Sequence, residues 1–434
     1  MSITNTTSES EDWTFLEYST KQHTHGFHLY PARMHPQIAK RLITKYAKPN
    51  QVVFDPFMGS GGVLVESLIH GNNTVGIDIN PFAVLLSKVK TTPIEGQKLT
   101  KIFDKLINSS KSDLTNKIPH DVAPKSKSLD LDFWYKKDVL NKLKILKHHI
   151  FDLRDDDVKD FFKICFSLTS RKCSNQRNSI YKIYRMNSKD LESFNPNVFD
   201  VFADVCKKNI IGMDNFVSEK KNAKAFPILG DSRNIESSFS KIPDSVLDDD
   251  KAHLVVTSPP YGDHSTTVAY GQFSKHLGLW LELPEEQLLA VDKVGLGGRK
   301  KDFAELESDL LDETIQQVEH NDKQITKKAN NPSRAQDVFA FFFDLDSCLN
   351  QISQNLKKGK SHCCFVVANR TVRRVKIPTD EIIVELAKKY GFTHTQTIYR
   401  TIANKAMSSK NAPENISDQV GETMTRESIV IWKY

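Results

Sequence analysis

The chain has 434 residues, of which 39% are hydrophobic and 26% charged, and its formal net charge is +6. This length allows a large core and two or more domains, or one domain with big insertions. No apolar run approaches the roughly 18 residues that a membrane span needs, so we expect no membrane partner, while the mild positive charge permits a polyanionic one.

The cysteines and the first residues bear on metal binding and on the compartment. None of the six cysteines lies in a CxxC pair, so the sequence predicts no metal site. Residues 1–7 are polar and resemble neither a signal peptide nor a basic transit peptide, and we expect a short disordered arm there. Free thiols without a targeting segment indicate a cytoplasmic protein.

Strand and helix patterns alternate along much of the chain, which favours a parallel α/β sheet. The expected strands are, in chain order, 52–54, 74–79, 226–229, 254–256, 363–368, 392–399 and 428–432. The expected helices are 35–46, 63–69, a segment beginning at Pro81, 339–356 and 380–390. The last two strands could pair antiparallel, and the whole pattern predicts a doubly wound, seven-stranded, mostly parallel Rossmann-like sheet.

Two segments interrupt this alternation. Residues 95–223 are lysine-rich and helical in pattern, whereas 284–335 is polar and charged and is expected to be a mobile loop with some helix. We therefore divide the chain into 1–94, the N-terminal arm with the cofactor-binding half of the catalytic domain; 95–223, a helical insertion; and 224–434, the catalytic half.

A glycine-rich turn follows the first expected strand, in the sequence Asp55-Pro56-Phe57-Met58-Gly59-Ser60-Gly61-Gly62. Glycines between a strand and a helix allow a sharp turn and a close approach of a ligand to the backbone. No Gly-Lys-Ser/Thr follows, which disfavours a phosphate cradle. The turn on its own is a weak signal, because many strand-to-helix turns contain glycine.

Carboxylates at the ends of strands strengthen the interpretation of this turn as part of a cofactor-binding site. Asp78, followed by Ile79, ends the second strand about 20 residues after the turn, where it can accept from both hydroxyls of a ribose. Asp231 and Ser232 end the third strand and could bond an adenine amine, and Asp55 would face the cofactor's amino group. A turn or capping role is the alternative for each aspartate.

The fourth strand ends in Ser258-Pro259-Pro260-Tyr261, at the edge where doubly wound sheets bind ligands. An aromatic exocyclic amine is a poor nucleophile because its lone pair is delocalised into the ring. Ser258 Oγ and the Pro259 carbonyl can each accept one N–H, which favours a pyramidal nitrogen and frees the lone pair for attack on a sulfonium methyl. Tyr261 offers a face on which a flipped base can stack. No cysteine is near, which argues against methylation at a ring carbon.

These motifs resemble the amino-methylating class of DNA methyltransferases, over about residues 25–94 and 226–434. Tyr30 and Arg33 lie in a segment similar to the family's N-terminal cofactor motif, and residues 400–405 also look like a family feature. The resemblance implies a class I methyltransferase fold, S-adenosylmethionine as cofactor, duplex DNA as substrate and a restriction-modification role beside a cognate endonuclease. The serine form of the tetrad is typical of enzymes that act on cytosine, whereas adenine enzymes more often carry Asp or Asn.

Basic residues in the insertion are interleaved with tyrosines and amides, which is a pattern that can neutralise phosphates and read bases. The insertion is thus a candidate target-recognition domain, although a solvated helix face is the alternative. A second basic cluster follows the fifth strand and includes Arg370. The candidate DNA-binding residues are Arg171, Lys172, Arg177, Lys182, Arg185, Arg373 and Arg374.

The sequence therefore predicts a site-specific DNA methyltransferase that transfers a methyl group from S-adenosylmethionine to the N4 amine of cytosine, with base flipping and direct in-line transfer. Three alternatives stay open. They are methylation of adenine N6, methylation of a guanine amine in RNA, and a catalytically silent module that binds nucleic acid.

Overall fold

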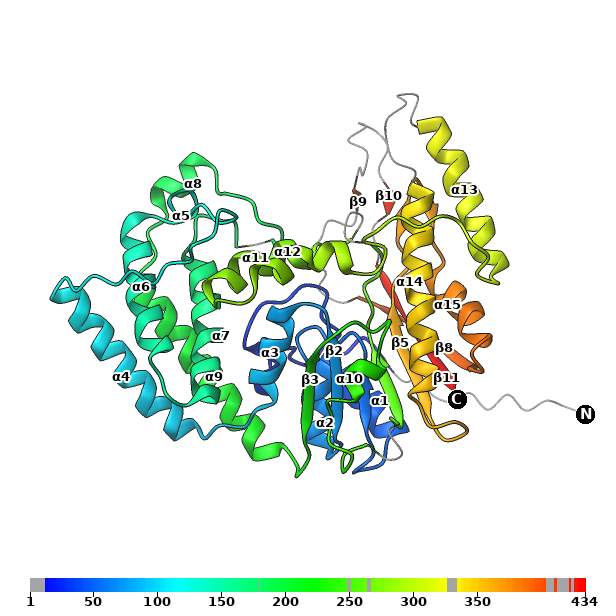
Figure 1. Ribbon diagram of the computed structural model, residues 1–434, viewed down its shortest axis with the longest axis horizontal. Coiled ribbons are helices and arrows are strands. Elements are labelled where there is room, and N and C mark those ends of the chain that lie inside the picture. Colours follow the sequence, from blue (N-terminus) through cyan, green and yellow to red (C-terminus); the bar gives the residue numbers. More distant parts are fainter. Residues whose placement is uncertain are drawn as a thin grey trace, which may run out of the picture.

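A seven-stranded sheet forms the centre of the protein (Figure 1), in a computed structural model that describes residues 12–178, 180–247, 251–263, 267–325, 334–402, 410–411, 421–422 and 425–434. In spatial order its strands are β3 (Ala225–Leu229), β2 (Thr74–Asp78), β1 (Val53–Asp55), β4 (Leu254–Thr257), β5 (His362–Val367), β11 (Arg426–Lys433) and β8 (Thr393–Thr401). β11 runs antiparallel to both of its neighbours, β5 and β8, whereas the other neighbouring strands of this sheet pair in parallel. The predicted sheet and its terminal antiparallel pair are thus confirmed.

The chain order of the strands reverses between β1 and β4, which are neighbours in the sheet. In open α/β sheets, ligands bind at such a switch point, beyond the carboxyl ends of the strands. The glycine turn follows β1 and the tetrad follows β4, so the fold brings both sequence motifs to this point.

Alternate residues of the central strands supply two separate cores. Val53, Leu254 and Val256 pack with α1 (Pro36–Tyr46) and the start of α2 (Gly62–His70) on one face. Phe54 and Val255 pack on the other face. That face is covered by α10 (Glu236–Phe239), α14 (Arg334–Gln354) and α15 (Thr379–Lys388). Burial on both faces explains why these strands are continuous apolar runs.

Six helices lie between α3 (Pro81–Thr91) and β3 and form the left-hand part of Figure 1. They are α4 (Gly96–Thr115), α5 (Leu131–Trp134), α6 (Lys137–Phe151), α7 (Asp156–Cys173), α8 (Ser188–Ser193) and α9 (Val198–Glu219). Their core is rich in aromatic residues such as Phe161, Phe162 and Phe202, and it continues into α3 and α11 (Tyr270–Trp280). The insertion is therefore packed against the sheet domain rather than tethered to it.

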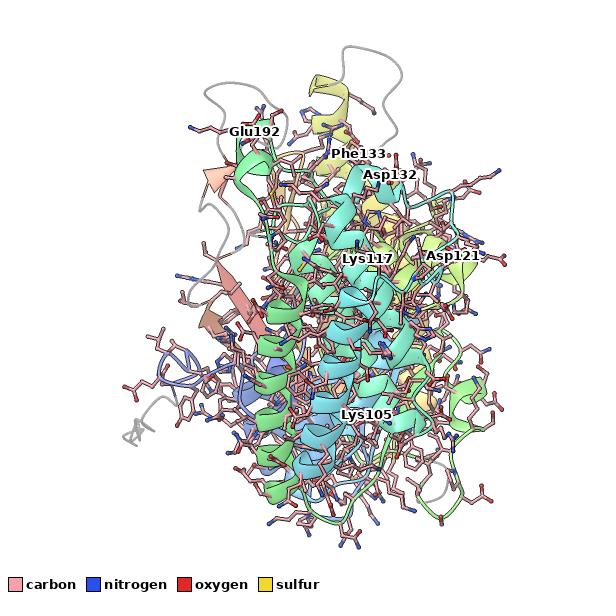
Figure 2. All side chains as sticks on the ribbon, turned by 90° about the vertical axis from the view of Figure 1, so that its left-hand side faces the viewer. Lys105, Lys117, Asp121, Asp132, Phe133 and Glu192 are labelled. Carbon is pink, nitrogen blue, oxygen red and sulfur yellow. The ribbon has the colours of Figure 1, made fainter. Side chains whose placement is uncertain are left out.

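The outer face of these helices carries charges of both signs. Figure 2 views this face, where Lys105, Lys117, Asp121, Asp132 and Glu192 are among the side chains that reach outward. Such a mixed surface is typical of a solvated face and gives no single-sign field that would attract DNA.

The segment 284–335, expected to be a mobile loop with some helix, contains two helices in its described residues, α12 (Glu285–Val294) and α13 (Asp309–Ile325). Leu311, Ile315 and Val318 recur at helical spacing and are buried, although the helix around them is polar. The turn between the helices also packs, since Gly297 N donates to Asp344 at 2.9 Å. The polar composition of the segment concealed the helical spacing of these apolar residues.

The remaining elements are short. They are η1 (His23–Gly26), β6 (Thr371–Val372), β7 (Val375–Lys376), β9 (Lys410–Asn411) and β10 (Gly421–Glu422). The arm predicted over residues 1–7 lies outside the described residues. Across the described ranges, no helix is both long and apolar enough to cross a membrane.

Candidate active site

The glycine turn after β1 depends on backbone conformations that favour glycine. Gly59 and Gly61 have φ angles of 48° and 73°, and Gly61 caps the start of α2. A Cβ on Gly61 would lie 2.8 Å from Ser87 Oγ, so the turn also needs the space that glycine leaves. Lys90, buried beneath, donates from Nζ to the Ser60 carbonyl at 2.6 Å. The turn is therefore rigidly placed at the carboxyl end of the sheet.

Asp78 lies directly beside this turn. Its Oδ2 accepts from Gly59 N at 2.9 Å and its Oδ1 from Asn80 N at 2.8 Å. Burial raises the pKa of Asp78 to about 6. Because each carboxylate oxygen can accept more than one hydrogen bond, the side chain retains capacity for ligand hydroxyls.

Asp55 connects the two sequence motifs. Its Oδ1 accepts from Thr257 Oγ1 at 2.6 Å and from Phe57 N at 3.1 Å, and Thr257 is the residue before Ser258. Burial, with a smaller contribution from the nearby Asp78 charge, raises the pKa of Asp55 to about 7. Two carboxylates thus lie under one turn with little cationic compensation, as a site for a cationic ligand would require.

The residues after β3 form hydrogen bonds and ion pairs that the sequence did not predict. Asp231 forms a two-pronged ion pair with Arg233, whose Nη2 lies 2.6 Å from Asp231 Oδ2. Arg233 also reaches Asp344, and these acids raise its pKa. Ser232 is buried and donates to the Pro56 carbonyl. Ser232 therefore braces the glycine turn, and the adenine-side role proposed for Asp231 must coexist with its ion pair to Arg233.

Tyr30 covers the turn from the N-terminal side. It is buried, and a Cβ on Gly59 would lie 3.3 Å from Tyr30 Cε1. Its ring centroid is 5.8 Å from that of Phe273 on α11. Arg33 Nη1 donates to the His25 carbonyl at 2.7 Å and so ties the segment that carries Tyr30 to η1.

The tetrad begins immediately after β4. Ser258 Oγ lies 3.4 Å from Tyr261 Oη, which donates to Glu427 Oε1 at 2.8 Å. Glu427 in turn pairs with Arg400 Nη1 at 2.5 Å, and Arg400 Nε donates to the Trp13 carbonyl. Burial and the adjacent Glu427 charge raise the pKa of Tyr261, so the phenol stays protonated. The hydrogen bond to Glu427, which is itself paired with the buried Arg400, therefore orients the Tyr261 side chain.

Glu427 was missed by the sequence interpretation, and Arg400 was noted only as a family feature. The two residues face each other in register on β11 and β8. A signal was present, because each is a charged residue within a strand, but their pairing follows only from the sheet. Residues 403–405 of the same expected feature lie outside the described residues.

The backbone after the tetrad is held by a second buried pair. Arg370 Nη1 lies 2.6 Å from Asp263 Oδ2, and both side chains are at most 3% exposed. A Cβ on Gly262 would overlap Arg370. Arg370 was expected to grip the DNA backbone, and its burial contradicts that role.

Arg171 was also expected at the DNA surface, and that prediction was wrong. Its side chain is buried, donates from Nη2 to the Ile180 carbonyl at 2.6 Å, and lies over the Phe273 ring at 5.1 Å. It anchors the loop between α7 and α8, defined here as residues 174–187, to α11. Lys172 is only half-buried.

The loop 174–187 carries the other predicted residues of the insertion. Arg177, Lys182 and Arg185 are exposed, and Arg177 N donates to the Tyr184 carbonyl within an irregular hairpin. The ring of Tyr181 lies 6.0 Å from that of Phe273, which contacts Tyr30. These aromatic contacts place the loop next to the cofactor motif, although it lies more than 90 residues further along the chain.

The second basic cluster turns between β6 and β7. Arg373 and Arg374 have φ angles of 47° and 66°, as a two-residue hairpin turn requires. Arg373 Nε pairs with Asp322 at 2.6 Å, whereas Arg374 is exposed. Only Arg374 of this pair therefore presents its side chain outward.

Comparisons with known proteins agree with this site. A family model described as DNA methylase matches residues 4–89. The type II methyltransferase M.MvaI from Kocuria varians is 39% identical over 440 residues, covering 96% of this chain and 93% of its own length. The chain belongs to the restriction-modification DNA amino-methyltransferases. A second relative, the type II methyltransferase M.MjaII from Methanocaldococcus jannaschii, is 37% identical over 22% of this chain and 18% of its own length.

A solved rRNA methyltransferase, aviRa from Streptomyces viridochromogenes, aligns over 94% of this DNA methyltransferase and 88% of its own chain. The TM-score is 0.32 and the identity 9%, so this likeness supports no statement about fold or substrate. DNA methyltransferases of this family use S-adenosylmethionine. The site fits that cofactor, because its turn leaves no room for side chains at Gly61 and its two carboxylates, the buried Asp55 and the partly buried Asp78, have raised pKa values.

Proposed function

We propose that this DNA methyltransferase modifies the N4 amine of cytosine in duplex DNA. The observation that carries the proposal is the serine at the head of the tetrad, which lies at the end of β4 beside the glycine turn. A hydroxyl accepts a hydrogen bond from an amine without bringing a negative charge into the site. This suits an amine whose nitrogen must become more nucleophilic while it faces an electrophile.

The cofactor would be held by the glycine turn and the acids around it. Asp78 accepts from ribose hydroxyls, Asp55 faces the amino group, and Asp231 with Ser232 borders the adenine. Tyr30 closes the turn from above, and Arg33 positions the segment that carries Tyr30. Pro56, Gly59, Gly61 and Ile79 contribute backbone and shape. S-adenosylmethionine, when bound, supplies a methyl group on a positively charged sulfur.

The amine would be held by Ser258 Oγ and the carbonyl of Pro259. Tyr261 Oη donates to Glu427, so its lone pair is available to the hydroxyl of Ser258. The Ser258 proton then points toward Tyr261 and the oxygen lone pairs face the amine. Pro260 fixes the backbone between the two groups, and the ring of Tyr261 stacks on the flipped base.

The DNA would be contacted by the loop 174–187. Arg177, Lys182 and Arg185 neutralise phosphates or read base edges, while Arg374 contributes from the β6–β7 turn on the sheet side. The insertion 95–223 then acts as the target-recognition domain, between the halves 1–94 and 224–434. The contact of Tyr181 with Phe273 supports this assignment, since it brings the loop beside the cofactor motif.

We infer further that the enzyme works in the cytoplasm with a cognate endonuclease, whose sites it protects. Both relatives named above are type II methyltransferases, and all six cysteines are free and buried. Restriction assays on DNA recovered from cells that express the enzyme would test this role.

The decisive experiment is transfer of a labelled methyl group from S-adenosylmethionine to unmodified DNA, followed by mass spectrometry of the nucleosides. N4-methylcytosine is the expected product, and Ser258→Ala should lower transfer by about 100-fold while cofactor affinity stays unchanged. N6-methyladenine would retain the mechanism and overturn the base assignment. Label in RNA alone would indicate an RNA enzyme, and cofactor binding without transfer would indicate a silent module.

A further inference from the structure

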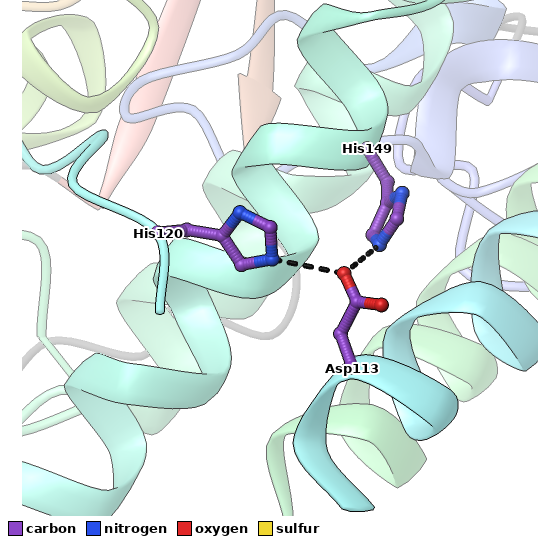
Figure 3. Close-up of side chains that lie close together, drawn as sticks. All are labelled: Asp113, His120 and His149. Carbon is purple, nitrogen blue, oxygen red and sulfur yellow. Dashed lines mark hydrogen bonds and ion pairs between the residues drawn. The ribbon is translucent and has the colours of Figure 1, made fainter. Parts of the chain in front are cut away.

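Three metal-ligating side chains meet in the insertion, away from the active site (Figure 3). Asp113 comes from the last turn of α4, His149 from the last turn of α6, and His120 from the loop after α4. Nε2 of His120 lies 2.8 Å and Nε2 of His149 lies 2.9 Å from the same oxygen, Asp113 Oδ2. The three atoms all lie within 4.8 Å of one another.

Two imidazole nitrogens and one carboxylate oxygen form a donor set that zinc binds readily. A tetrahedral ion with ligands at about 2.0–2.1 Å holds neighbouring donors about 3.3 Å apart. The observed pairs would therefore have to separate by about half an ångström, which small rotations of the side chains supply. The histidines and Asp113 retain side-chain exposures of 9–21%, so an ion and one water have access from solvent.

The surroundings also favour a cation. Both α4 and α6 end at the cluster, and the C-terminal end of a helix carries a partial negative charge. Asp113 adds a full negative charge in the last turn of α4, where a carboxylate is unfavourable without compensation. His148 stacks on His120 with ring centroids 4.1 Å apart and so helps to hold that imidazole at the cluster.

We propose that Asp113, His120 and His149 bind one divalent transition-metal ion, with zinc preferred. The ion would tie the loop 116–130 to the ends of α4 and α6. Further along this loop, Ser126 Oγ donates to Glu285 at 2.6 Å, in the first turn of α12. Because α12 packs on α11, which carries Phe273, the ion would brace the insertion against the helices beside the active site.

The absence of paired cysteines could not exclude this site, because its ligands are histidines and an aspartate that lie up to 36 positions apart. Within the described ranges, neither histidine uses its Nδ1 in a hydrogen bond to another residue. Such outer-shell partners typically strengthen metal sites by about 10–100-fold. We therefore expect moderate affinity rather than the very tight binding of a closed structural site.

The test is a titration of metal-free, full-length protein with Zn²⁺ at pH 7.5 against a chromophoric chelator, with the Co²⁺ absorption spectrum as a second readout. We expect one ion per chain. His120→Ala and His149→Ala should each weaken binding by at least tenfold, whereas His394→Ala, at an exposed histidine on β8, should not change it. Zn²⁺ should also raise the melting temperature of the wild type.

Asp113→Asn separates metal binding from hydrogen bonding. The amide oxygen still accepts from the two imidazoles, so the fold and its circular dichroism should be retained, while the Zn²⁺ affinity and the melting-temperature shift should be lost. Binding that all three cluster variants leave unchanged would put the ion elsewhere. Absence of binding to the wild type would make the cluster a hydrogen-bonded triad, and either result would overturn the proposal.

Discussion

At the scale of single residues, the hydrogen-bonded chain Ser258–Tyr261–Glu427–Arg400, which is buried at Glu427 and Arg400, also sets the direction of each hydrogen bond in it. Every link has a defined direction, because Arg400 can only donate and the ionised Glu427 can only accept. The phenol must therefore donate to Glu427, which leaves its lone pair for Ser258. A charged pair on two C-terminal strands thus determines which way a serine proton points at the carboxyl end of β4.

The consequence can be measured with Glu427→Gln. Loss of the charge leaves Arg400 without its carboxylate and weakens the anchor of Tyr261, so we expect kcat for methylation to fall about tenfold with cofactor affinity unchanged. Stability should also fall by about 3 kcal/mol, since one partner of a buried pair is removed. Glu381→Gln, at an exposed site on α15, is the matched control.

A double-mutant cycle distinguishes positioning from simple destabilisation. In a Tyr261→Phe background the hydroxyl is already gone, so Glu427→Gln should lower kcat little further. Equal losses in both backgrounds would show that Glu427 does not act through Tyr261.

At the scale of elements, β1 and β4 could be predicted from sequence because strands buried on both faces are continuous apolar runs. The glycine turn and the tetrad were placed correctly for the same reason, since each follows such a strand. The bounds of α13 were not predicted, because three apolar residues in a polar helix do not dominate the composition. Arg171 was misassigned because a basic residue in a lysine-rich stretch gives no sign that it packs under a neighbouring loop. The Asp263–Arg370 pair spans 107 positions, so only the folded sheet reveals it.

The loop 174–187 provides a test at this scale, because the exposed Arg177 lies in it and the buried Arg171 lies just before it on α7. Arg171→Ala should lower the free energy of unfolding by about 2–3 kcal/mol, since it removes a charged hydrogen bond to the Ile180 carbonyl and the packing on Phe273. Arg177→Ala should change stability by less than about 0.5 kcal/mol but weaken DNA binding and lower its salt slope by about 1. Chemical denaturation and DNA titrations at several salt concentrations measure the two effects. The opposite pattern would restore Arg171 to the DNA surface.

At the scale of the whole molecule, the fold places two carboxyl groups whose ionised forms are destabilised by burial at one edge of the sheet. The parallel strands β1 and β2 end side by side, so the buried Asp55 and the partly buried Asp78 lie at the same edge of the sheet. In the unfolded chain an aspartate has a pKa of about 3.9, whereas burial raises the two folded values to about 7 and 6. Ionisation of these groups therefore opposes folding, and in the proposed cofactor site a cationic amino group and ribose hydroxyls would offset that cost.

The sign of the pH dependence follows from linkage. Because the folded pKa values are higher, the folded state binds more protons than the unfolded state. The contribution of these two groups to the free energy of unfolding is therefore complete below about pH 4 and is lost as pH rises through 6 and 7. From these two groups we expect the cofactor-free protein to be less stable at pH 7.5 than at pH 5.5. A ligand with a cationic amino group opposes this loss of stability at higher pH, since it favours the ionised form of Asp55. S-adenosylhomocysteine should therefore raise the melting temperature more at pH 7.5 than at pH 5.5, and Asp55→Asn should remove most of that difference. An equal shift at both pH values in the wild type would mean that Asp55 is already ionised or does not face the amino group.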